Sequence, residues 1–225
     1  SKAVFEGLRG GIHEALKKVG ASLIGGDLSR SPGPIVIDVT VLGEARDLVT
    51  RTGISSGDEV WVTGVLGGSA GAVNIWLDGG DPNTELRNAF ARPPFRVPEA
   101  RWLVKNAGIR TMIDLSDGLL RDAGHLARAS GVRIVIESKK VPLHPGLDAD
   151  IALRLGMSGG EDYELCLASK EGVLGPLVET FEKQFGLGLT RVGYVETGSG
   201  IEIKGTEGNV GPPANSILGF DHFSV

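Results

Sequence analysis

The stretch 111–122, with the sequence TMIDLSDGLLRD, most constrains what this chain can fold into. Apolar residues lead into Asp114, a second acid follows at Asp117, and an apolar pattern of helical period comes after them. This order predicts a strand that ends at Asp114 and passes directly into a helix. Ser116 is the expected N-cap of that helix, and Gly131 is expected at its C-terminal end.

Two interpretations of this strand-to-helix corner stay open. Asp114 at the strand end and Asp117 in the first helical turn could point into one space, where two hard oxygen donors would hold Mg²⁺. Alternatively, Ser116 only caps the helix and Asp117 only complements the helix dipole. The second interpretation leaves Asp114 without a role.

Charge and composition exclude several classes of protein. The formal net charge is −5 and the sequence pI is about 5.4, so the chain has no basic field for nucleic acid or for an anionic membrane surface. A phosphate ligand would therefore be held by metal ions, backbone amides and a few placed cations. The single cysteine, Cys166, lies in an apolar run and excludes an intrachain disulfide, which favours a cytoplasmic location. No apolar stretch reaches the roughly 20 residues of a spanning helix.

The remaining pattern alternates between strands and helices and predicts an α/β fold. Charged and turn-rich residues from 44 onward suggest a domain boundary, with one domain over 1–43 and a second over 44–225. Strands are expected at 21–27, 35–42, 59–63, 133–137, 165–168, 190–195 and 201–203. Helices are expected at 3–19, from the glycine turn at 64–71 to 77, and at 85–91, 99–108, 149–155 and 173–185.

Three glycine-rich turns precede or adjoin acids. In the first, the strand 21–27 ends in Gly25, Gly26 and Asp27, either as an ordinary hairpin loop or as a backbone that approaches phosphate while Asp27 binds a metal. The turn at 64–71 either packs a helix closely on a strand or faces a phosphate at a helix N-terminus. The segment 156–165, GMSGGEDYEL, is either a turn with exposed acids or a second carboxylate-bearing ligand loop.

Arginines offer few candidate phosphate contacts. Arg92 and Arg96 lie in a proline-rich surface excursion, from which they could reach a phosphate or remain solvated.

The four histidines are scattered without cysteine partners, and no Ser/His/Asp order stands out, so a zinc site or a hydrolytic triad is not expected. Carboxylates and glycine turns suit Mg²⁺-dependent phosphoryl transfer, in which the protein mainly positions donor and acceptor. An acceptor that is itself a phosphate would need no strong base.

Several motifs together resemble the thiamine-monophosphate kinases, which belong to a superfamily of ATP-binding proteins. The resemblance runs over essentially the whole chain in the same order. Its most specific parts are the pair DLSDGL at 114–119 and SGGEDYEL at 158–165. The motifs that carry it are GGD at 25–27, Arg51 followed by GD at 57–58, DLSDGL, SGGEDYEL, and GFDHF at 219–223.

The resemblance implies an α/β (α+β) fold and transfer of the γ-phosphoryl group of ATP to thiamine monophosphate, which gives thiamine diphosphate and ADP. The implied cofactor is Mg²⁺, and ATP is a substrate. By position, the implied metal ligands are Asp27, Asp114 and Asp117. No residue is implied as a catalytic acid or base.

The resemblance also implies which residues contact the two substrates. Gly26, Arg51 and Ser116 correspond to ATP contacts, with Arg51 placed to meet phosphate oxygens. Glu161 corresponds to a substrate contact, and Phe220 corresponds to an aromatic residue that lies against the thiamine moiety. The expected partners are these small molecules, with no nucleic acid and no membrane.

The family pattern extends beyond this chain. Family members carry a further N-terminal segment that holds more metal-binding acids and the strands that build a homodimer. We therefore expect 1–43 to be the remnant of an N-terminal ATP- and metal-binding domain, and 44–225 to be a complete C-terminal α/β domain with a mixed sheet packed with helices. Two alternatives stay open: a sister enzyme of the superfamily with another acceptor, and a non-catalytic nucleotide-binding fragment.

Overall fold

The computed structural model of the chain describes residues 1–45 and 47–205. Its contacts divide the chain into two compact units, Ser1–Arg46 and Asp47–Val225. Whether the first unit is the remnant of an N-terminal domain that ends at residue 43 stays a prediction. Phe220 lies outside the described residues.

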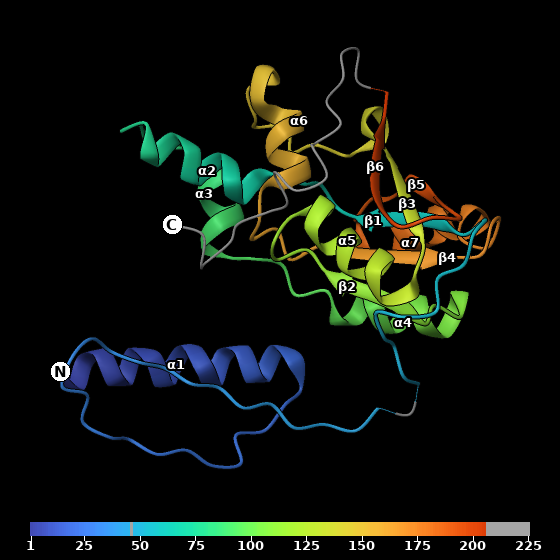
Figure 1. Cartoon of the computed structure of the whole chain (residues 1–225). Coiled ribbons are helices and arrows are strands. Elements are labelled where there is room, and N and C mark those ends of the chain that lie inside the picture. Colours follow the sequence, from blue (N-terminus) through green and yellow to red (C-terminus); the bar gives the residue numbers. More distant parts are fainter. Residues whose placement is uncertain (46, 206–225) are drawn as a thin grey trace. The chain divides into compact units, whose positions relative to one another are not determined.

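The first unit consists of one helix and an extended segment (Figure 1). Helix α1 (Lys2–Val19) begins where the Ser1 side chain accepts a hydrogen bond from the Val4 amide, and it ends at Gly20, whose φ is 70°. The strands expected at 21–27 and 35–42 are not formed, so that prediction is wrong for this structure. A strand needs a hydrogen-bonded neighbour, and an isolated pair is marginal in water. The apolar side chains of these segments accordingly remain exposed.

The second unit is built on a mixed, six-stranded sheet in the order β2-β4-β1-β5-β3-β6 (Figure 1). All neighbouring strands are antiparallel except β3 and β6, which are parallel. The strands are β1 (Glu59–Thr63), β2 (Thr111–Asp114), β3 (Arg133–Glu137), β4 (Leu165–Ser169), β5 (Leu189–Glu196) and β6 (Gly200–Lys204). The expected α/β fold and the five strands expected after residue 58 are confirmed within a residue or two, with β2 as the predicted strand into Asp114.

Helices cover both faces of this sheet. The helices are α2 (Gly68–Leu77), α3 (Thr84–Ala91), α4 (Val97–Ala107), α5 (Leu119–Ser130), α6 (Ala149–Ser158) and α7 (Val178–Phe185). Short 3₁₀ turns lie at η1 (Ser138–Lys140) and η2 (Gly175–Leu177). The helix predicted over 173–185 is therefore shorter than expected, because Pro176 in η2 cannot donate a backbone hydrogen bond to an earlier turn.

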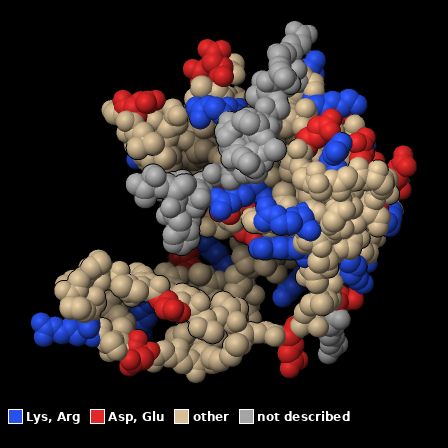
Figure 2. Space-filling view, in the orientation of Figure 1, with Lys and Arg blue, Asp and Glu red and all other residues tan. Residues whose placement is uncertain are grey.

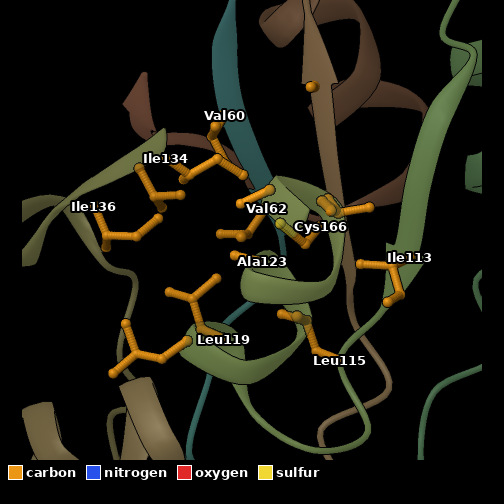
Figure 3. Packing of buried hydrophobic residues seen from close by; sticks show 14 of the residues in the cluster. Val60, Val62, Ile113, Leu115, Leu119, Ala123, Ile134, Ile136 and Cys166 are labelled. Atoms are coloured by element: carbon orange, nitrogen blue, oxygen red, sulfur yellow. The ribbon is translucent and has the colours of Figure 1, made fainter. Parts of the chain in front are cut away.

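Alternation along the strands sends side chains into two separate cores. Val60 and Val62 of β1 point to the face that α5 covers, whereas Trp61 between them points to the face covered by α4 and α7. Figure 3 shows Leu119 and Ala123 of α5 directed at the side chains of the strands. Both faces of the sheet are thus buried, which explains the nearly continuous apolar strands that the sequence contains.

The helices of the described residues include none that is long and apolar enough to cross a membrane. Acidic and basic side chains are interspersed on the visible face of the second unit, as Figure 2 shows. This distribution agrees with the small net charge of the sequence.

The backbones of β3 and β5 approach closely at Gly193, so a side chain at this position should lower the stability of the fold. Gly193 of β5 lies opposite Ile136 of β3, and a Cβ at this glycine would lie 2.1 Å from the Val135 carbonyl oxygen. Gly193→Ala should lower the free energy of unfolding by about 1–3 kcal/mol, because the clash is with backbone that cannot rotate away. Urea unfolding followed by circular dichroism measures this loss. Gly188→Ala, where a Cβ meets nothing within 4 Å, is the matched control and should change stability little.

Candidate functional site

The corner between β2 and α5 is the first component of the site. Asp114 is the exposed last residue of β2, and Asp117 lies half-buried two residues before α5 begins. The predicted cap is wrong: the N-cap is Gly118, and the Asp122 carboxylate accepts the amides of Asp117 and Gly118, each at 3.0 Å. Asp122 thus holds the two residues that lead into α5, and no described side chain caps the first turn of this helix. The expectation that Gly131 ends the helix in a left-handed conformation is confirmed.

The second component is the loop at 159–164, which hydrogen-bonds to the corner along its length. The Glu161 amide donates to the Ser116 carbonyl at 2.9 Å, and the Tyr163 amide donates to the Leu115 carbonyl at 2.9 Å. The Leu115 amide returns a bond to the Glu164 carbonyl at 2.8 Å. These bonds extend the β2–β4 ladder and fix the SGGEDYEL motif beside the DLSDGL motif.

Charged side chains of the corner interact with a side chain of the loop. Burial, followed by the charge and hydrogen bonding of Glu161 and the charges of Asp114 and Asp117, raises the pKa of the Tyr163 phenol. Asp122 has its pKa raised to about 6, mainly by burial and further by the charges of Asp117 and Asp114, although the amides that it accepts act in the opposite direction. Negative charge therefore accumulates at this corner, which a cation would neutralise.

Asp117, Asp122 and His125 offer ligand atoms that lie within 4.8 Å of one another, a cluster found among the described residues. Burial, and then the charges of Arg128, Arg51 and Arg121, lower the pKa of His125, which favours its neutral, metal-binding form. The two carboxylates of this cluster suit a hard divalent cation such as Mg²⁺, whereas the imidazole suits a transition metal, and Asp114 is not part of the cluster. Sequence reasoning missed Asp122 and His125, although their helical spacing of three residues places both on one face of α5.

An open pocket of about 290 Å³ adjoins the corner and includes two predicted site residues, Arg51 and Asp114. Its other lining residues are Val49, Thr50, Met112, Ile113 and Leu165. The segment that carries Arg51 runs beside the edge strand β2, because the Thr50 amide donates to the Arg110 carbonyl and the Met112 amide donates to the Thr50 carbonyl. A guanidinium and a carboxylate on an apolar floor can hold a charged ligand with an apolar portion.

The structure brings together Arg51, Asp114, Ser116, Asp117 and Glu161 in the second unit. The remaining predicted residues do not belong to the described part of this unit. Gly26 and Asp27 belong to the first unit, where the Asp27 carboxylate accepts the Ser29 hydroxyl at 2.9 Å, and Phe220 lies outside the described residues. Their roles as ATP, metal and substrate contacts stay predictions.

The glycine turn at 64–71 packs against protein, but its neighbours are residues of other helices and loops and not the strand that the first interpretation expected. A Cβ at Gly67 would lie 2.8 Å from the Gly156 backbone nitrogen. The buried Asp162 carboxylate accepts the Gly67 amide at 2.8 Å and occupies the helix N-terminus where a phosphate would bind. The interpretation of 156–165 as a turn with only exposed acids is wrong, because Asp162 and Glu164 are buried.

Arg96 is committed to an internal ion pair. Its guanidinium donates to both oxygens of the buried Glu164, at 2.8 and 2.6 Å, and it also contacts Glu99 at 3.2 Å. These contacts leave the side chain only 18% exposed, so both interpretations of Arg96, as a free phosphate contact and as a solvated side chain, are wrong.

Similarity to known proteins identifies the family. Over 201 residues the chain is 36% identical to the thiamine-monophosphate kinase of Methanopyrus kandleri, an alignment that covers 86% of this chain and 61% of that protein. It is 30% identical over 220 residues to the thiamine-monophosphate kinase of Pyrococcus horikoshii, with 97% and 67% covered. The chain belongs to the thiamine-monophosphate kinase family. No family model matches the chain.

Solved structures of thiamine-monophosphate kinases agree with this membership. A solved structure of a ThiL protein complexed with AMPPCP and TMP aligns with a TM-score of 0.62 and 30% identity, covering 78% of this chain and 54% of that one. The chain thus spans about three fifths to two thirds of the length of these curated relatives and about half of this solved one.

The stability of the chain should depend on pH through the buried carboxylate of Asp162. Burial raises its pKa from 3.8 to about 7, despite the hydrogen bonds from the amides of Gly67, Ser69 and Gly68, and the nearby charge of Glu164 adds to the rise. Between about pH 4 and pH 7 the unfolded chain is ionised here while the folded chain keeps its proton. The folded state therefore loses stability as the pH rises through this range.

Asp162→Asn removes this titration. Relative to the variant, the wild type should lose about 2–4 kcal/mol of unfolding free energy as the pH rises from 4 through the folded-state pKa, and the loss should level off at about pH 8. Denaturant unfolding of both proteins at several pH values measures the difference. A constant difference between the two proteins over this range would contradict the prediction.

Proposed function

We propose that this chain carries part of an Mg²⁺-dependent kinase that transfers the γ-phosphoryl group of ATP to the phosphate of thiamine monophosphate. The observation that carries the proposal is the convergence of Asp114, Asp117 and Glu161, from two distant motifs, at one corner beside the pocket of Arg51. Family membership supports the identity of the substrates. The ThiL relative that was solved in complex with AMPPCP and TMP supports the same pair of ligands.

Different side chains of the corner and its pocket bind the metal ion and the phosphate groups. Asp114 and Asp117 would hold Mg²⁺, which would neutralise phosphate charge and orient the transferred group. Arg51, which lines the same pocket as Asp114, offers a planar guanidinium to phosphate oxygens. Ser116 presents a half-buried hydroxyl between the two metal-binding acids.

Glu161 suits the acceptor substrate by charge. Thiamine carries a permanently cationic thiazolium ring, and the exposed Glu161 carboxylate next to Tyr163 offers it an anionic partner. The acceptor phosphate is ionised at neutral pH, so it attacks without a general base and the protein contributes mainly by alignment. We also propose the homodimeric state, the cytoplasmic location and the contributions of Gly26, Asp27 and Phe220 on the basis of the family resemblance alone.

Two alternatives predict different products. A sister enzyme would phosphorylate another acceptor, whereas a nucleotide-binding module would bind Mg²⁺ and ATP and leave ATP unchanged. The assay uses the longest natural protein that contains this chain, with Mg²⁺, ATP and a panel of phosphorylated acceptors. Formation of thiamine diphosphate supports the proposal. Absence of this product from the intact protein contradicts it.

Asp117→Asn tests the assigned metal ligand. Loss of one anionic oxygen should lower kcat by about 100-fold or more, and raising the Mg²⁺ concentration should restore part of the rate. Steady-state kinetics at several Mg²⁺ concentrations measure both effects. Glu171→Gln, an exposed loss of charge after β4, is the control and should leave kcat and the Mg²⁺ dependence unchanged.

A further inference from the structure

The loop at 161–164 alternates between inward and outward side chains. Asp162 and Glu164 point inward and are 8% and 5% exposed. Glu161 is exposed and Tyr163 is half-buried, and these two face the acids of the corner. The inward residues contact neither the corner nor the pocket through any described side-chain hydrogen bond, so their burial calls for a separate explanation.

The outward residues are held in an unfavourable backbone conformation. Glu161 has a φ of 67° and Tyr163 has a φ of 50°, and they are the only non-glycine residues with positive φ in the described part of the chain. Such a conformation is unfavourable for a residue with a side chain and persists only where the surroundings fix it. The amides of Glu161 and Tyr163 each make one hydrogen bond to the corner, and further restraint must come from their neighbours.

Asp162 fixes the loop on one side. Its carboxylate accepts the Gly67 amide at 2.8 Å and also bonds the amides of Gly68 and Ser69 at the start of α2. These amides are donors that a helix N-terminus cannot satisfy internally, so the contact is favourable for both partners. The loop is thereby tied to a helix that packs on other parts of the second unit.

Glu164 fixes the loop on the other side. Its Oε2 accepts the Thr63 hydroxyl at 2.6 Å, and Arg96 donates to both of its oxygens. Gly64 leaves room for this carboxylate, since a Cβ there would lie 2.1 Å from Oε1. A buried bidentate ion pair of this kind is costly to break from one side, because the partner charge is then left unpaired.

We propose that Asp162 and Glu164 are positioning residues that hold Glu161 and Tyr163 in their strained conformation, facing Asp114 and Asp117. Each anchor lies next to the residue that it restrains, on opposite sides of the loop. The kinetic part of this inference rests on the proposed function, since it takes Glu161 as the substrate contact. The structural part does not depend on any activity.

Hydrogen exchange tests the structural part. In Asp162→Ala the amides of Glu161 and Tyr163 should exchange about tenfold faster or more, because the released strain favours opening of the loop. Amides of the central strands should change much less. Asp162→Asn, which keeps an acceptor for the Gly67 amide, should restore most of the protection.

Asp58→Ala is the matched control. Asp58 is also a buried carboxylate that accepts a backbone amide, from Ser55, and it pairs with Lys170 at the opposite end of β1. This variant should lower stability without speeding exchange at Glu161 and Tyr163. If exchange at these two amides rises equally in Asp58→Ala, or does not rise in Asp162→Ala, the anchoring role is wrong. Should Asp162→Ala not fold, Glu164→Gln carries the same test with the same expected direction.

Steady-state kinetics test the functional part with the longest natural protein that contains this chain. Asp162→Ala should raise KM for thiamine monophosphate about tenfold or more while KM for ATP stays within about twofold, and Asp162→Asn should recover most of the affinity. Equal changes in both KM values, or none, would overturn the kinetic part while turnover by the wild type still supports the proposed function. A wild type without turnover contradicts that function and leaves the exchange result to decide the anchoring.

Discussion

The antiparallel pairing of β2 with β4 is the interaction on which the site depends. Asp114 lies opposite Leu165, so the chain leaves β2 at the same place where it enters β4. The ladder then continues past the strands through bonds between 115–116 and 161–164. Two motifs that are distant in sequence are thus joined by backbone hydrogen bonds. These bonds fix the positions of their side chains relative to one another. A slip of one residue would turn Asp114 to the opposite face of the sheet.

Buried carboxylates give this region its electrostatic character. Asp122 and Asp162 each satisfy the first amides of a helix or its entrance, yet burial still raises the pKa of both. Glu164 instead has a guanidinium partner, Arg96, which arrives from the turn before α4. Acids of the first kind are tolerated near neutral pH because they can retain a proton, whereas Glu164 is paired with the guanidinium of Arg96. The loop thus contains both kinds of buried acid, one that accepts backbone amides (Asp162) and one that pairs with an arginine (Glu164).

The sequence predicts local features of this fold better than distant ones. Apolar periodicity is sufficient to predict the strands β1 to β6, including β2, which ends at Asp114. Each of these patterns reflects the burial of side chains on the faces of the sheet. Periodicity fails at 21–27 and 35–42, where a strand also requires a partner that the first unit does not provide. Ser116 is a reasonable N-cap by residue type, but the N-cap is Gly118, and Asp122 accepts the amides of Asp117 and Gly118 just before the helix. The burial of Asp162 depends on Gly67, 95 residues away, and no local pattern reports that contact.

Glycines show why a motif can be recognised correctly while its physical meaning is misread. One of the two interpretations of 156–165 from the sequence is a ligand loop, in which the glycine pair before Glu161 admits the ligand. In the structure, a Cβ at Gly160 would lie 2.5 Å from the Ser116 carbonyl, and one at Gly118 would lie 2.9 Å from the Ser158 carbonyl. These glycines therefore permit one motif to pack against the other, and an alanine at either position would separate the two backbones. The ligand-facing surface is then formed by the side chains of Glu161, Asp114 and Asp117, whose convergence depends on the absence of side chains beneath them.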